Sequence, residues 1–240
     1  MKILAFDSTA KAASVSILSD GKILADYTVD NGLTQSELLL PMAEAMLGAL
    51  KLDFSDIDIF ATSVGPGSFT GVRIGTALVK GLAFGREAAT VAVSTIEALA
   101  ENLAGIRGII VPCMDARRGQ VYTALFRSDE GGIRRLTEDM AIPLTTLRDM
   151  LKEYGGEPIY LTGDGYTGAH KALTELGLEL MRTPERCILE SAASVARVAE
   201  RIYLAGGAVS DKELAPTYLR VPQAERERLE RLDAEKSAKS

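Results

Sequence analysis

The 240-residue sequence has no tryptophan, a single histidine (His170) and two cysteines (Cys113 and Cys187). These few nitrogen and sulfur ligands are spread far along the chain and cannot supply the four ligands of a structural zinc site. Two cysteines cannot make a disulfide framework either. Aromatic residues make up only 5% of the chain, too few for a platform on which single-stranded nucleic acid stacks. The composition therefore excludes a zinc-stabilised or disulfide-stapled domain and predicts no metal site.

The charge balance and the hydrophobic pattern exclude further classes. Lys and Arg number 27 against 33 Asp and Glu, and this net charge of −6 opposes unaided binding to nucleic acid, which needs a surplus of cations. The apolar run at the N-terminus ends after four residues at Asp7, so neither a signal peptide nor a membrane span is predicted. With 47% apolar residues, the chain can bury the core of one or two domains. We expect a reduced, cytoplasmic protein without membrane contact.

The first half of the chain predicts a mixed α/β sheet. Short apolar runs separated by turn residues predict three strands in an antiparallel meander, at 2–7, 14–18 and 22–28. Thr34 and Glu37 have the spacing of a capping box that opens a helix running to about residue 50. Strands and helices then alternate, with a strand at 57–64, a helix at 71–84, a strand at 90–93 and a third helix after Ser94.

The second half repeats this layout. A strand at 109–115 ends in Asp115, as the first strand ends in Asp7, 108 positions earlier. A Gly-x-Gly turn at 163–165 follows a strand, as a similar turn does at 65–67, 98 positions earlier. The similar offsets predict a duplication, against the alternative of a chance similarity between two α/β halves.

The duplication sets the predicted domain boundaries. We expect two similar subdomains, each a mixed sheet flanked by helices, at 1–106 and 107–222, followed by a charged tail at 223–240. A last helix at 191–205 and the segment 208–222 are candidates for packing back on the first subdomain.

Two acidic residues and a glycine-rich turn are the candidates for a ligand site. In a duplicated fold, Asp7 and Asp115 would face each other across a central cleft and could hold a metal-bound nucleotide. The turn at Gly65 and Gly67 joins a strand to a helix, where backbone amides could hold an anion, although the sequence is not a P-loop. The alternatives are that each Asp caps a turn and that the glycines allow close packing, and these structural roles are favoured because no glycine follows Asp7. We assign the four residues to a vestigial cofactor cleft and identify no catalytic residue.

The helix after Thr34 has a wide apolar face. Its apolar side chains cover an arc of about 200°, whereas a helix on one core needs about 100°. The excess predicts a second buried face, under another part of this chain or against another subunit, and we favour a subunit interface. The second helix, rich in Gly and Ala, would lie beside it. The predicted interface residues are Leu38, Leu39, Met42, Ala43, Met46, Leu47, Gly71, Gly75 and Ala77.

Five segments together resemble the TsaB (YeaZ) family, namely 3–9, 34–41, 63–75, 114–122 and 216–220. The resemblance covers the chain except its charged tail. It implies a duplicated actin-like, Hsp70-like (ASKHA) fold. It also implies a part in forming threonylcarbamoyladenosine in tRNAs that read codons beginning with adenine.

The resemblance further implies a noncatalytic subunit. Such a chain pairs with the catalytic relative TsaD through its two N-terminal helices, allows the ATPase TsaE to join, and forms a homodimer when alone. ATP and threonylcarbamoyl-adenylate are used by the complex, tRNA is bound through it, and no cofactor is expected on this chain alone. TsaD carries a His-x-x-x-His metal motif where this chain has Gln35 to Leu39, without histidine.

Two other functions stay open at this point. A stand-alone ATPase, kinase or glycoprotease-like hydrolase of the same fold would use Asp7 and Asp115. Direct tRNA binding is opposed by the acidic total and would use the cations Arg73, Lys80, Arg117 and Arg118.

Overall fold

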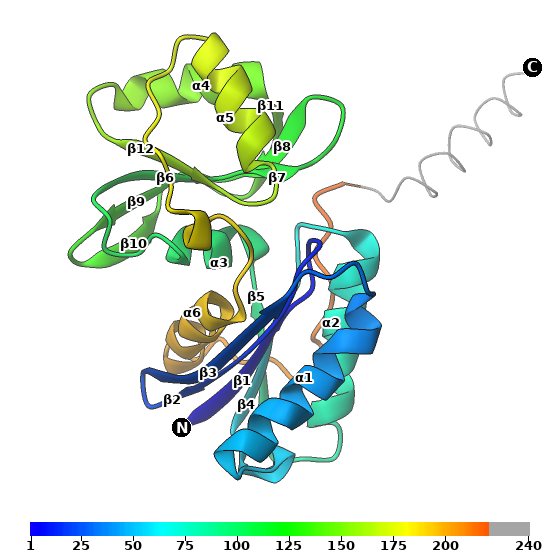
Figure 1. The fold of residues 1–240 in the computed structure, drawn as a ribbon. Coiled ribbons are helices and arrows are strands. Elements are labelled where there is room, and N and C mark those ends of the chain that lie inside the picture. The colour runs from blue at the N-terminus through cyan, green and yellow to red at the C-terminus, as the bar shows by residue number, and fades with distance from the viewer. Residues whose placement is uncertain (221–240) are drawn as a thin grey trace, which may run out of the picture.

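The computed structural model describes residues 1–220, which form two lobes (Figure 1). The tail predicted at 223–240 lies outside the described residues. The first lobe is built on a five-stranded sheet in the order β3-β2-β1-β4-β5. The elements are β1 (Lys2–Asp7), β2 (Ala13–Ser19), β3 (Lys22–Val29), β4 (Ile59–Ser63) and β5 (Ala89–Val93). The first three form the predicted antiparallel meander, while β4 runs parallel to β1 and β5 runs parallel to β4.

Side-chain caps fix where the helices of this lobe begin. At the start of α1 (Gln35–Leu50), the backbone N–H of Thr34 donates to the Glu37 carboxylate at 3.0 Å, which confirms the predicted capping box. The Ser68 hydroxyl accepts from an amide in the first turn of α2 (Phe69–Ala83), and the Ser94 hydroxyl does the same for α3 (Thr95–Glu101). A short 3-10 turn, η1 (Phe54–Asp56), follows α1. Helices α1 and α2 lie side by side on one face of the sheet (Figure 1).

The wide apolar arc of α1 is covered by the chain itself. Five of its residues are buried in one cluster with Leu4 and Phe6 of β1, namely Leu39, Met42, Ala43, Met46 and Leu47. Because α1 packs against both β2 and α2, two elements of the same lobe cover the arc. Of the two alternatives for the second buried face, burial under another part of this chain therefore accounts for the arc, and the preference for a subunit interface at these residues is wrong.

The second lobe repeats the first with broken strands. Its sheets have the orders β10-β9-β6-β12 and β11-β8-β7. The strands are β6 (Gly108–Pro112), β7 (Met114–Asp115), β8 (Gln120–Thr123), β9 (Phe126–Asp129), β10 (Gly132–Arg135), β11 (Met140–Pro143) and β12 (Ile159–Thr162). The remaining elements are α4 (Leu144–Leu151), η2 (Lys152–Tyr154), α5 (Tyr166–Glu175), η3 (Glu185–Cys187) and α6 (Ala192–Leu204). In the first of these sheets, β10, β9 and β6 form an antiparallel meander and β12 runs parallel to β6. This arrangement matches that of β3, β2, β1 and β4 in the first lobe.

The continuous strand predicted at 109–115 is interrupted, and so is the extended run at 120–129. At the first break the Cys113 amide donates to the Thr162 carbonyl at 2.6 Å. At the second break the Leu125 amide donates to the Thr137 hydroxyl at 2.9 Å. Strands β6 and β9 belong to one sheet and β7 and β8 to the other, so the chain passes between the two sheets at each break.

The last helix returns to the first lobe. Ala192, Val195 and Ala199 of α6 are buried in one cluster with Ile3 and Ala5 of β1. Helix α6 thus covers the sheet face opposite α1 and α2, as Figure 1 shows. None of the helices within residues 1–220 is both long and apolar enough to cross a membrane.

Candidate functional site

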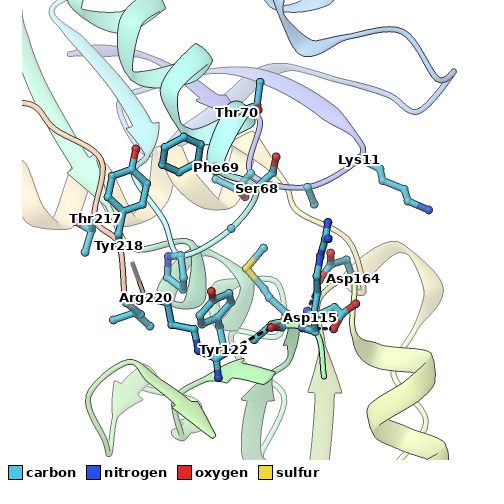
Figure 2. Close-up of a pocket in the computed structure, with 18 of the residues that line it drawn as sticks. Lys11, Ser68, Phe69, Thr70, Asp115, Tyr122, Asp164, Thr217, Tyr218 and Arg220 are labelled. Atoms are coloured by element: carbon cyan, nitrogen blue, oxygen red, sulfur yellow. Dashed lines mark hydrogen bonds between the residues drawn. The ribbon is translucent and has the colours of Figure 1, made fainter. Parts of the chain in front are cut away.

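A cleft of about 700 Å³ lies between the two lobes. Its lining comes from the β1–β2 turn, the turn before α2, the β7–β8 turn and the extended segment 217–220. In Figure 2, Ser68 and Phe69 lie on the first-lobe side, and Asp115 and Tyr122 lie on the second-lobe side. A volume of this size suits a small molecule or a single nucleotide.

Asp7 is fully buried and is not one of the residues that line the cleft. Its carboxylate accepts hydrogen bonds from the Ser63 hydroxyl at 2.5 Å and from the Thr9 amide and hydroxyl at 2.9 and 2.7 Å. Burial raises the pKa of Asp7, while these hydrogen bonds act to lower it. The expectation that Asp7 faces Asp115 across the cleft is wrong, since the Asp7 side chain instead caps its turn.

Asp115 lines the cleft and shapes the β7–β8 turn. Its carboxylate accepts from the Arg117 amide at 2.7 Å, and its own amide donates to the Asp164 carboxylate at 3.1 Å. Arg117 and Arg118 follow with φ of 61° and 56°, in the left-handed region that favours glycine. The turn therefore holds two arginines at the cleft in a backbone conformation that costs free energy.

The glycine-rich turn holds segments of the chain close together. A Cβ at Gly65 would overlap the Thr217 carbonyl oxygen, and a Cβ at Gly67 would lie 2.7 Å from the Thr9 carbonyl oxygen. The amide of Ser68 donates to the same Thr9 oxygen at 2.7 Å, and the amide of Gly71 donates to the Ser68 hydroxyl at 3.2 Å. Close packing accounts for these glycines, and the protein itself uses two of the amides at the start of α2.

The segment 214–220 joins the two lobes at the cleft. The Thr217 amide donates to the Val64 carbonyl in the first lobe at 2.7 Å. Tyr218 stacks on Phe69 with ring centroids 5.1 Å apart, and its hydroxyl accepts from Arg73, which lies 3.7 Å from the centre of the Phe69 ring. Arg220 donates to the Ala116 carbonyl in the second lobe at 3.1 Å. The contact with the first lobe agrees with the prediction that the segment 208–222 packs back on the first subdomain, whereas no sequence pattern predicts its contact with the second lobe.

A buried glutamate beside the cleft carries no motif in the sequence. Glu190 precedes α6 where the chain passes from the second lobe to the first, and only 3% of it is exposed. Neither carboxylate oxygen has a hydrogen-bond partner within residues 1–220. Burial first, and then the charges of Asp7 and Asp164, raise the pKa of Glu190 to about 8. In the described part of the chain, no three His, Cys, Asp or Glu side chains are grouped so that they could hold a metal ion.

The predicted interface residues lie mostly inside the first lobe. Besides the five buried in α1, Gly71 and Gly75 of α2 pack against Ser8. Leu38 is half-buried and Ala77 is exposed. The exposed apolar and small residues of this helix pair, which we call the outer face, are instead Leu40, Pro41, Ala45, Gly48, Ala49, Ala77 and Gly81, with Phe84 directly after α2. Phe84 is 76% exposed, and the charged Glu37, Glu44 and Arg73 are exposed on the same two helices.

Two lobes that repeat one meander with an added parallel strand, around a central cleft, define an actin-like ATPase fold. The solved structure of YeaZ from Pseudomonas aeruginosa has the same fold, with a TM-score of 0.74 and 24% identity over 91% of this chain and 99% of that chain. The fold predicted from the sequence is confirmed.

Sequence comparisons identify the family. The family model for TsaD, tRNA N6-adenosine threonylcarbamoyltransferase, matches residues 34–216. The tRNA threonylcarbamoyladenosine biosynthesis protein TsaB of Bacillus subtilis is 32% identical over 94% of this chain and 96% of its own length. TsaB of Escherichia coli is 31% identical over 92% of this chain and 95% of its own length. The chain belongs to the TsaB family of tRNA threonylcarbamoyladenosine biosynthesis proteins, within the wider family that the TsaD model describes.

Proposed function

We propose that this chain is the noncatalytic partner of a TsaD-type threonylcarbamoyltransferase and that the outer face pairs with that enzyme. The observation that carries the proposal is the chemistry of the outer face. It joins Leu40 and Ala45 of α1 with Ala77 of α2 and with Phe84 directly after α2, and small side chains allow another backbone to approach closely. Apolar side chains grouped on an exposed face are typical of a binding site.

The family supports the choice of partner in this proposal. The names of the TsaB relatives assign them to tRNA threonylcarbamoyladenosine biosynthesis, and the model of the transferase family matches most of this chain. A transferase of the same fold would carry a corresponding helix pair, so the two chains could pair through equivalent faces. The same face would serve a homodimer when the partner is absent. TsaE would join this pair, and we assign ATP and threonylcarbamoyl-adenylate to the other subunits of the assembly. We place the assembly in the cytoplasm.

A supporting role for this chain agrees with the state of its acidic residues. The Asp7 carboxylate is fully buried and engaged by Ser63 and Thr9, so it is not exposed to a substrate in the cleft. The Asp115 carboxylate holds the amide of Arg117. Both residues act on their own turns, as expected of a chain that retains the fold and supports catalysis elsewhere.

The test is pairing by outer-face variants. Ala45→Glu places a carboxylate on the outer face, and Ala104→Glu places the same group on an exposed alanine outside both helices. An unpaired charge buried in an interface costs about 3 kcal/mol, so Ala45→Glu should weaken binding to TsaD by more than 100-fold in calorimetry. Ala104→Glu should bind as the wild type does.

Two results would overturn the proposal. The first is equal binding by Ala45→Glu and the wild type, since the outer face would then not be the pairing surface. The second is ATP turnover by the purified chain alone that is lost in Asp115→Asn, which would favour the stand-alone enzyme.

A further inference from the structure

Cationic side chains gather at the cleft although the chain as a whole is acidic. Lys11, Arg117, Arg118 and Arg220 line the cleft together with two acidic residues, a local charge of +2 in a chain with a net charge of −6. Within residues 1–220, no ion pair includes any of these four cations. Lys11, from the first lobe, and the adjacent arginines, from the second, are exposed. The cleft is therefore suited to an anion that both lobes contact.

The arginine pair is held at the cleft at a cost. A left-handed backbone is unfavourable for a residue with a Cβ, and Arg117 and Arg118 both adopt it in succession. The Asp115 carboxylate accepts a hydrogen bond from the Arg117 amide, and the Gln120 amide donates to the Arg117 carbonyl at 3.2 Å. Glycine would satisfy the same turn without strain, and strained residues concentrate where they serve binding.

Aromatic rings lie beside these cations. Tyr122 and Tyr218 both line the cleft, one from each lobe, and Tyr218 is 41% exposed. The Arg220 guanidinium lies 5.8 Å from the centre of the Tyr122 ring. Arginine planes and tyrosine rings are the surfaces on which unpaired RNA bases stack, while neighbouring cations hold the phosphates. The low aromatic content of the whole chain thus conceals a local pair of rings at the cleft.

We propose that the cleft binds a single-stranded segment of the tRNA, with a phosphate between Lys11 and the Arg117–Arg118 pair and a base on the tyrosine rings. A free nucleotide shares this chemistry, and the experiment below distinguishes it from RNA. Of the amides at the start of α2 that would hold its terminal phosphates, those of Ser68 and Gly71 are already engaged by the Thr9 carbonyl and the Ser68 hydroxyl. The inference rests on the proposed function, because the pathway named for the relatives supplies the RNA.

The experiment compares two double variants that remove the same charge. Arg117→Gln/Arg118→Gln removes the cleft pair, and Arg107→Gln/Arg134→Gln removes two exposed arginines that do not line the cleft. Each full-length variant is paired with TsaD, and its binding to fluorescein-labelled tRNA is followed by anisotropy between 50 and 200 mM salt. The cleft variant should bind at least about tenfold more weakly at low salt, with the slope of log affinity against log salt reduced by about 1.4. The other variant should bind tRNA within twofold of the wild type.

Two further measurements separate the possible failures. Calorimetry with TsaD tests pairing, so absence of pairing by the wild type contradicts the proposed function. Intact pairing with unchanged tRNA affinity in the cleft variant overturns only the present inference. Calorimetry of ATP against the isolated chain tests the free nucleotide, and ATP binding that the cleft variant loses would overturn the assignment to RNA.

Arg117→Gly/Arg118→Gly relieves the backbone strain, so it should lose tRNA affinity while its unfolding midpoint rises.

Discussion

Replacing Glu190 by glutamine should stabilise the protein and change how its stability depends on pH. The carboxyl group is buried beside Asp7 and Asp164, and no described residue donates a hydrogen bond to it. Glutamine keeps the size of the side chain and removes its ionisation. The exposed Glu185, in η3, offers a matched control in Glu185→Gln.

The sign and size of the effect follow from the pKa of Glu190. In the unfolded chain the group releases its proton near its ordinary pKa of 4.5, whereas in the folded protein it does so at about 8. Between these values the folded state binds more protons than the unfolded state, so the free energy of unfolding falls as the pH rises. One such group contributes at most about 1.4 kcal/mol per pH unit, or roughly 2 kcal/mol between pH 5.5 and 7.5.

The assay is urea denaturation at pH 5.5, 6.5 and 7.5, followed by circular dichroism. The difference in stability between Glu190→Gln and the wild type should grow by roughly 2 kcal/mol across this range, because the variant lacks the proton uptake. Glu185→Gln should follow the wild type. Parallel pH profiles for Glu190→Gln and the wild type would refute the reasoning that burial holds a proton on this residue.

Two further predictions concern packing and thiol chemistry. Gly71→Ala should lower the free energy of unfolding by about 1–3 kcal/mol, because the new Cβ would overlap the Ser8 carbonyl oxygen. Gly81→Ala should raise the free energy of unfolding by about 0.5–1 kcal/mol, because there is open space around Gly81. Urea midpoints check both, and equal effects would contradict the close approach of α2 to Ser8. Cys113 and Cys187 are buried, and burial raises the pKa of Cys113 to about 12, so neither thiol should react with Ellman's reagent at pH 8 until the protein unfolds. Rapid modification of the native protein would contradict this burial.

Local chemistry predicted much of the first lobe. A short apolar run bounded by turn residues predicts β1 at its observed bounds, and Thr34 with Glu37 predicts the beginning of α1. The strand breaks at Cys113 and Leu125 were not predictable, because their amides bond to residues distant in sequence. The last helix is a predicted candidate for packing back on the first subdomain, but no local pattern shows that it covers β1 and its neighbours, because that contact depends on the packing of the two lobes.

The site was less visible in the sequence than the fold. The apolar residues of α1 look alike in sequence whether they face a core or a partner, so the sequence predicts Leu39 and Met46 at an interface although they are buried. Glu190 carries no motif, and its proximity to Asp7 arises only when the chain crosses between lobes. Net charge and aromatic content average over the chain, so they could not reveal the cations and tyrosines that gather at the cleft.

Reconstitution of the tRNA modification tests the central claim most directly. Labelled threonine transferred to tRNA is measured with TsaD, TsaE and supplied threonylcarbamoyl-adenylate, with and without this chain. We predict that modification requires the chain, is lost with Ala45→Glu and is retained with Asp115→Asn, whose amide oxygen can still accept from the Arg117 amide. Full modification without the chain, or loss with Asp115→Asn while Ala45→Glu stays active, would contradict a noncatalytic partner that acts through its outer face.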